Sequence, residues 1–259
     1  MNQQKLVGWV DRLSPDGSSA TKLTFRCGKP HLNPPMELDL SNENLTTLEG
    51  IDLPEGLLEL NCNYNKLTSL PPLPSTLIIL YCSGNKLTSL PPLPPSLIEL
   101  RCNWNQLTGL PPLPLSLQHL QCWSNRLTSL PPLPPTLVIV SCEKNQLTSL
   151  PSLPRTLTGL DCRYNQLTSL PPLPTSLTVL YRDGNQLPSH YYEESIDKLR
   201  LVIRIDRLRK AHSILTRLVG DWVARNIQRL WKRYWLEPYH DAERGYRVSR
   251  YLLHYQHEL

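Results

Sequence analysis

Six cysteines occupy one position of a repeated pattern, and they are the residues best suited to metal binding or disulfide chemistry. They are spaced 20 residues apart: Cys62, Cys82, Cys102, Cys122, Cys142 and Cys162. No CxxC pair accompanies them and no histidine recurs beside them, which argues against a zinc site or a disulfide framework. On stacked parallel strands they would instead form an inward ladder of small apolar side chains. Free thiols suit a reducing compartment, so we predict a cytoplasmic protein without a metal or cofactor.

Catalytic motifs are absent from the sequence. It contains no GxGxxG, P-loop, HExxH or GxSxG pattern, each of which carries a defined chemistry. His240, Asp241 and Glu243 lie close together, but they follow Pro238 and are interpreted as a solvated turn. We therefore predict that the chain is not an enzyme and has no small-molecule substrate.

A 20-residue frame, L-x-x-L-x-C-x-x-N-x-L-T-S-L-P-P-L-P, positions the cysteines from residue 57 into the 180s. This period and these leucine positions are typical of leucine-rich repeats, in which each repeat adds one strand to a curved parallel sheet. We expect the Pro-Pro-Leu-Pro segments to return as extended, polyproline-like chain. We also expect a structural role, bonding backbone groups of adjacent turns, for the marker asparagines: Asn65, Asn85, Asn105, Asn125, Asn145, Asn165 and Asn185.

The predicted fold is an α/β repeat solenoid, a horseshoe with a parallel concave sheet, an extended convex side and a cap at each end. Residues 1–36 match no repeat and are assigned to the N-terminal cap, with a strand expected within 23–27. Residues 37–190 form about eight repeats, the first of which has Glu43 in place of the marker asparagine. Residues 191–259 form a helical, basic tail with 14 Lys/Arg against 9 Asp/Glu; a break near His212–Ser213 or Gly220 would divide it into two helices, and the sequence leaves one helix or two open. No run is apolar for long enough to predict a membrane span.

The outward positions of the predicted strands vary between repeats, whereas the Pro-Pro-Leu-Pro segment hardly changes. The fold does not require particular side chains at these positions, yet several hold aromatic or cationic residues. Such a composition is typical of the centre of a protein interface, and exposed tryptophan is unusual without a binding role. We therefore predict a protein-binding concave face formed by Tyr64, Tyr81, Arg101, Trp104, Trp123, Lys144, Arg163, Tyr164 and Tyr181.

Two interpretations of the tail stay open. In the first, a helical cap covers the last repeat with its apolar stripe. In the second, a basic amphipathic helix binds a calmodulin-like protein and the repeats are its scaffold. The second rests on half of an IQ-like motif, although Glu237 stands where a basic residue is expected, and its residues are Ile227, Gln228, Trp231, Lys232 and Arg233. A net charge of +5 over the tail is too small to predict nucleic-acid binding.

The frame at residues 87–94, LTSLPPLP, resembles the short bacterial-type repeats of secreted effectors such as the invasion-plasmid-antigen family of enteric pathogens. The stretch at residues 227–238, IQRLWKRYWLEP, resembles the C-terminal tails of repeat proteins from giant DNA viruses of amoebae. These resemblances imply a product that acts on a protein in the cytoplasm of a host cell. Several such effectors add a ubiquitin ligase domain with a catalytic cysteine, but no cysteine follows Cys162 and the tail is too short for that domain.

Overall fold

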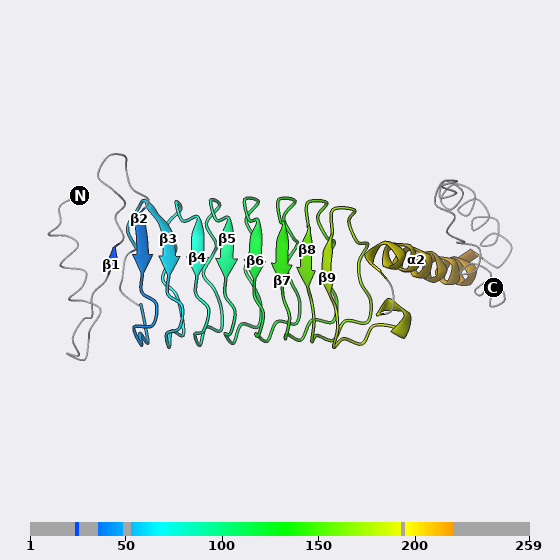
Figure 1. The fold of residues 1–259 in the computed structure, drawn as a ribbon, viewed down its shortest axis with the longest axis horizontal. Coiled ribbons are helices and arrows are strands. Elements are labelled where there is room, and N and C mark those ends of the chain that lie inside the picture. The colour runs from blue at the N-terminus through cyan, green and yellow to red at the C-terminus, as the bar shows by residue number, and fades with distance from the viewer. Residues whose placement is uncertain (1–23, 26–35, 49–52, 193–194, 220–259) are drawn as a thin grey trace. The chain divides into compact units, whose positions relative to one another are not determined.

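The structure is a computed structural model that describes residues 24–25, 36–48, 53–192 and 195–219. Within them, nine strands lie side by side in chain order and form one sheet (Figure 1). The first two strands pair antiparallel, and every later strand pairs parallel with the strand before it. The strands are β1 (Thr24–Phe25), β2 (Met36–Asp39), β3 (Leu57–Asn61), β4 (Ile79–Tyr81), β5 (Glu99–Arg101), β6 (His119–Gln121), β7 (Ile139–Ser141), β8 (Gly159–Asp161) and β9 (Val179–Tyr181).

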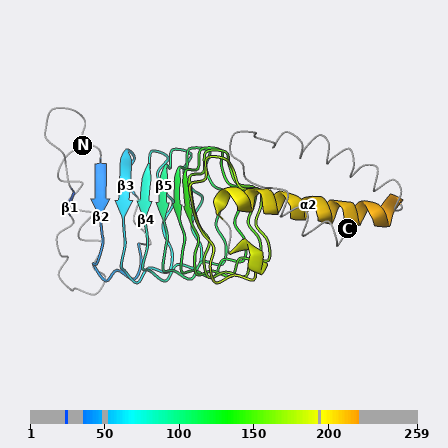
Figure 2. The same ribbon diagram turned by 45° about the vertical axis from the view of Figure 1, so that its right-hand side comes forward.

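The 20-residue period determines both the stacking and the register of the strands. From β3 onward each strand residue pairs with the residue 20 positions later, so that Leu60 lies beside Leu80. Because side chains alternate along a strand, Leu60 and Cys62 point into the coil and are buried, while Glu59 and Asn61 point outward. A single coil leaves its apolar side chains open above and below, so the core is shared by all the repeats. The strands lie along one side of the stack and the return segments along the other (Figure 2).

The return segments of the described repeats contain neither helix nor strand, in agreement with the extended chain that their prolines predict. Prolines leave these segments with few N–H donors, and a side-chain hydroxyl supplies one where each segment meets the next strand. Ser96 Oγ donates to the Leu77 carbonyl, 19 residues earlier, at 2.7 Å. We call this series the hydroxyl ladder; its other members are Thr76, Ser116, Thr136, Thr156 and Ser176.

The marker asparagines hydrogen-bond successive repeats to one another at the turn that follows each strand. The Oδ1 of buried Asn105 accepts the Leu87 N–H at 3.0 Å, and its Nδ2 donates to the carbonyls of Cys82 and Cys102 at 3.0 and 3.1 Å. Each side chain thereby pairs backbone groups of two repeats that would otherwise be buried without partners. The same pattern of bonds is made by Asn65, Asn85, Asn125, Asn145, Asn165 and Asn185.

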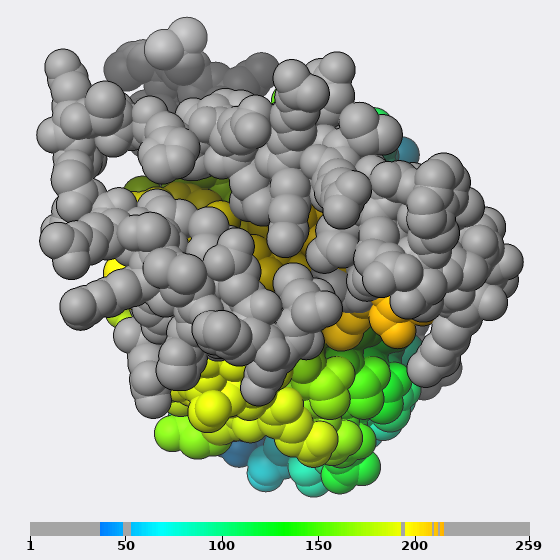
Figure 3. Space-filling model, turned by 90° about the vertical axis from the view of Figure 1, so that its right-hand side faces the viewer, coloured from blue at the N-terminus to red at the C-terminus, as the bar shows by residue number. Residues whose placement is uncertain are grey.

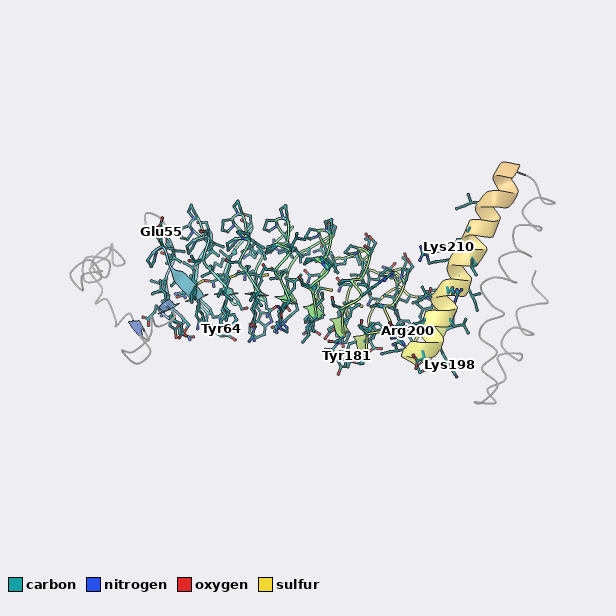
Figure 4. The ribbon with its side chains drawn as sticks, turned by 90° about the horizontal axis from the view of Figure 1, so that it is seen from above. Glu55, Tyr64, Tyr181, Lys198, Arg200 and Lys210 are labelled. Atoms are coloured by element: carbon teal, nitrogen blue, oxygen red, sulfur yellow. The ribbon has the colours of Figure 1, made fainter. Side chains whose placement is uncertain are left out.

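The array is closed at its C-terminal end by a 3₁₀ turn, η1 (Ser189–Tyr191), and by the start of helix α2 (Ile196–Val219). Figure 3 looks onto this end, with the last repeats in yellow and green. Tyr191, Leu199 and Ile203 are buried and extend the apolar core beyond the last repeat. Arg200 Nη2 donates to the carbonyls of Pro174, Thr175 and Leu177 at 2.9, 3.2 and 2.8 Å (Figure 4). Because a further repeat would place a hydroxyl on the Leu177 carbonyl, Arg200 takes the next position of the hydroxyl ladder.

The chain divides into two compact units, residues 1–203 and 204–259, and each is described by itself. Helix α2 runs unbroken through His212–Ser213, which decides a point that the sequence left open, and Gly220 lies outside the described residues. At the other end, β1 lies within the segment where a strand was predicted. No helix in the described part of the chain combines the length and apolar character needed to cross a bilayer.

Candidate functional site

We use the term concave face for the outward side chains of β2 to β9 together with the three residues that follow each strand. Figure 4 shows Tyr64 and Tyr181 on this side of the array and Glu55 on the opposite side. Of the predicted binding residues, Tyr81, Arg101 and Tyr181 end strands β4, β5 and β9. Trp123 and Arg163 follow two residues after a strand, and a third group lies one residue further on, in a turn: Tyr64, Trp104, Lys144 and Tyr164.

The turn after each strand holds its middle residue in the left-handed region of backbone conformation. Trp104 has a φ of 51° and Tyr64 a φ of 55°, values that glycine adopts readily and bulky residues adopt at a cost. The turn brings the next residue, the marker asparagine, into the core. The same conformation recurs at Gly84, Ser124, Lys144, Tyr164 and Gly184. The sequence analysis did not predict this left-handed turn. The glycine found at this position in two of the seven repeats could have indicated it.

Two tyrosines of this turn each lie over a glycine of the following repeat. A Cβ added to Gly84 would lie 2.7 Å from Cδ1 of Tyr64, and one added to Gly184 would lie 2.5 Å from Cδ1 of Tyr164. The two tyrosine side chains nevertheless remain more than half exposed. Each of these two tyrosine rings therefore uses the space that the glycine of the next repeat leaves free.

Trp104 and Trp123 form an aromatic pair in the middle of the concave face. Their ring centroids are 5.2 Å apart at an interplanar angle of 79°, an edge-to-face arrangement. Trp104 is 52% exposed and nearby Ile139 is 40% exposed. The pair thus presents a rigid apolar surface of the kind that anchors protein partners.

The two arginines of the predicted site are held by acidic and aromatic neighbours. Arg101 Nε lies 2.6 Å from Glu99 Oε1, and its guanidinium lies 4.7 Å from the centroid of the Tyr81 ring. Burial, together with the Glu99 carboxylate, raises the pKa of the Tyr81 phenol.

Arg163 has a corresponding arrangement near the other end of the array. It contacts Asp161 and Glu143 at 2.7 and 2.9 Å and lies 4.9 Å from the centroid of the Tyr181 ring. In both places a carboxylate partly neutralises the guanidinium, and the aromatic ring beneath it helps to hold the cation in place.

Some outward positions that sequence reasoning treated as unconstrained also serve the fold. Asn63 Oδ1 accepts the N–H of Ser83 at 2.7 Å, Ser83 Oγ accepts that of Asn103 at 3.2 Å, and Asn103 Oδ1 accepts that of Trp123 at 3.0 Å. Three successive small polar residues at one position were the signal that could have identified these bonds. These three side chains therefore connect repeats, and the larger residues beside them are the ones available for binding.

The cysteine ladder offers no reactive site. All six thiols are free and buried, and burial raises the pKa of Cys62, Cys102 and Cys162 to about 12. Cys102 Sγ lies 3.5 Å from the Gln121 carbonyl, an acceptor for its S–H. The thiolate needed for nucleophilic attack or metal binding is thus strongly disfavoured. The described residues contain no group of three or more histidine, cysteine or acidic side chains able to hold a metal ion.

The tail residues proposed for calmodulin-like binding all lie outside the described residues: Ile227, Gln228, Trp231, Lys232 and Arg233. Of the two predicted binding surfaces, the concave face is therefore the one that lies within the described residues.

Comparison with known proteins identifies similar structures. The leucine-rich-repeat domain of a Shigella effector is 30% identical over 80% of this chain and 83% of its own, with a TM-score of 0.54. YopM, a leucine-rich effector protein from Yersinia pestis, is 33% identical with a TM-score of 0.51, over 58% of this chain and half of its own. No protein-family model matches the chain, and a comparison with curated proteins finds no match.

Proposed function

Because the chain belongs to the leucine-rich-repeat proteins of the type found in bacterial effectors, we propose that it is a non-catalytic module that binds a partner protein on its concave face. The repeat array presents many side chains on one rigid surface, which suits protein recognition. A host-cell protein is the partner that the effector-like repeats favour. The assignment concerns the repeat array, and it makes no use of the tail.

The observation that carries this proposal is the exposure of aromatic side chains at positions where the frame accepts other residues. The turn that holds Trp104 holds glycine in two other repeats and serine or lysine in two more. The Trp104 and Trp123 rings also contact each other edge to face, which restricts the rotamers of both side chains. Binding to such a pair costs little side-chain entropy, which is why aromatic residues dominate the energetics of interfaces.

The proposal is tested by capture of partners from a host-cell lysate with full-length baits. Trp104→Ala/Trp123→Ala should lose the partner that the unchanged chain captures, because it removes the apolar anchor. Leu115→Ala is the matched control, since Leu115 is also an exposed apolar residue, 74% exposed, but lies in a return segment. All baits should keep the cooperative thermal unfolding of the unchanged chain.

A third variant bait distinguishes the array from the tail. It carries Trp231→Ala, Lys232→Gln and Arg233→Gln, and it should still capture the partner. Loss of the partner with this bait alone, and retention with the tryptophan variant, would contradict the proposal and assign binding to the tail.

A further inference from the structure

Charge is distributed unevenly along the concave face. In β2 to β5 the outward strand positions hold Glu37, Asp39, Glu59 and Glu99, which we call the acidic patch. The register aligns Glu37 with Glu59, and only the Ile79 position separates Glu59 from Glu99. Arg101 is the only cation at the outward strand positions of β2 to β5, and its Nε is bound to Glu99.

The remaining carboxylates of the acidic patch are not neutralised. None of Glu37, Asp39 and Glu59 forms an ion pair with a residue that the structure describes. The consequence is visible at Glu59, where partial burial and repulsion from Glu37, Glu99 and Asp39 raise the pKa of the carboxyl. Glu143 and Asp161, toward the other end of the array, are by contrast both paired with Arg163. Among the outward strand positions of the described sheet, carboxylates without an ion pair to a described residue are therefore found in β2 and β3.

The acidic patch adjoins an apolar surface. Beyond Glu99, the outward strand residues of β6 and β7 carry no charge when His119 is neutral. Trp104, in the turn after β5, and Ile139, on β7, are exposed, and Trp123, after β6, is partly exposed. From β3 to β6 there are three strand spacings, about 14 Å, which an extended chain spans with about four residues. The carboxylates lie on three strands, β2, β3 and β5, and the described residues contain no cluster of three or more that could hold a metal ion.

We propose that the concave face binds an extended segment of a partner protein, with two or three lysine or arginine side chains against Glu37, Asp39 and Glu59 and an apolar side chain, about four residues away, against Trp104 and Trp123. This inference rests on the proposed function and specifies the chemistry of the partner. Charge complementarity selects the basic residues, and the aromatic pair selects the apolar one. The partial burial of Glu59 strengthens the attraction, because a partly buried charge is screened less by salt.

A direct test uses a fluorescent peptide with three lysines, a four-residue Gly-Ser spacer and a Trp-Leu end, and a matched peptide with glutamates in place of the lysines. Binding to the full-length protein is measured by fluorescence anisotropy at low and at physiological ionic strength. The lysine peptide should bind, more weakly at higher salt, and the glutamate peptide should bind at least about tenfold more weakly. Equal affinity of the two peptides, or no binding of the lysine peptide, would overturn the inference.

Variants of the full-length protein locate the site. Glu37→Gln/Glu59→Gln should weaken lysine-peptide binding by about five- to tenfold, because it removes two partly buried carboxylates that would contact the lysines. Glu55→Gln is the control, since Glu55 is exposed on the opposite side of the array (Figure 4). Neutralising the patch relieves repulsion, so the double variant should unfold at an unchanged or higher temperature, and weaker binding could not then be attributed to unfolding.

Two results would separate this inference from the proposed function. If Glu37→Gln/Glu59→Gln still binds the lysine peptide like the unchanged protein, while Trp104→Ala/Trp123→Ala loses its captured partner, the face recognises proteins but not through basic residues. If a tail variant, Arg229→Gln/Lys232→Gln/Arg233→Gln, binds the lysine peptide far more tightly than the unchanged protein, the occupant of the patch is the chain's own basic tail. Either result would overturn the partner chemistry proposed here.

Discussion

Arg200 occupies the last position of the hydroxyl ladder, and replacing it tests how the array is closed. Arg200→Met keeps an unbranched apolar stem but removes the donors from the carbonyls of Pro174, Thr175 and Leu177. A hydrogen bond from a charged group contributes about 1.5–3 kcal/mol where it is shielded from water. The Arg200 side chain is 23% exposed, and methionine recovers part of the apolar packing. We therefore expect the free energy of unfolding to fall by about 2 kcal/mol in total rather than by that amount for each bond.

The assay is equilibrium urea unfolding of the full-length protein, followed by circular dichroism, together with hydrogen exchange of the last repeat. Amides of the strand β9 region should exchange faster in Arg200→Met, because a repeat array loosens first at an end that lacks its cap. Lys210→Met is the matched control, since it removes the same charge from an exposed position of α2. Equal unfolding midpoints for the two variants would show that Leu199 and Ile203 alone close the array and that the guanidinium is dispensable.

Three further predictions concern the repeat frame. Asn105→Ala should lower the free energy of unfolding, measured by urea titration, by about 2–4 kcal/mol, because the buried Leu87 N–H loses its acceptor. Asn185→Ala should lower it by less, because Asn185 lies in the last repeat and is more exposed. Gly84→Ala should lower the free energy of unfolding by about 1–2 kcal/mol, because the residue has a positive φ and the new methyl group would meet the Tyr64 ring. Adding Tyr64→Ala should recover only the part of this loss that is due to the ring contact. If the effects of the two substitutions are purely additive, the contact is refuted. Burial raises the pKa of Cys102 from 9.0 to about 12. The stability contributed by its protonated thiol is therefore complete below pH 9 and is lost as the pH rises toward 12. Between these pH values the urea midpoint of Cys102→Ala should fall less steeply than that of the unchanged protein.

The repeat frame was predictable because a residue type that recurs every 20 positions must occupy the same environment each time. Leucine at the Leu80 position and cysteine at the Cys82 position predict burial, and both are fully buried. The extended return segments follow from prolines that cannot donate hydrogen bonds. Asparagine is one of the few side chains that can both accept and donate at a buried turn, which explains why it recurs at the Asn85 position.

Features without repetition were beyond sequence reasoning. Arg200 occurs once, on a helix, and only the folded chain shows that its guanidinium reaches the carbonyl that a hydroxyl bonds in earlier repeats. The left-handed turn was hidden for the opposite reason, since its position holds residues as different as Tyr64, Gly84 and Lys144. Arg163 lies two residues after Asp161 and 20 residues after Glu143, so the repeat places the three side chains close together, but only the folded chain shows that both carboxylates pair with the guanidinium.

The left-handed turn after each strand is required by the fold, whereas the side chain at that position is not. An aromatic residue at this position costs about 1 kcal/mol or more relative to glycine in backbone conformation. Tyr64, Trp104 and Tyr164 are each more than half exposed, and burial of the rest of each ring is of a size that offsets this cost. Folding does not require an aromatic residue here, because Gly84 and Gly184 show glycine to be compatible with the repeat. We therefore interpret the three exposed aromatic residues as meeting a demand other than folding, and the paired arginines and the acidic patch lie on the same face. Substitutions at these positions should leave stability unchanged or higher while removing binding, whereas substitutions in the repeat frame should lower stability first.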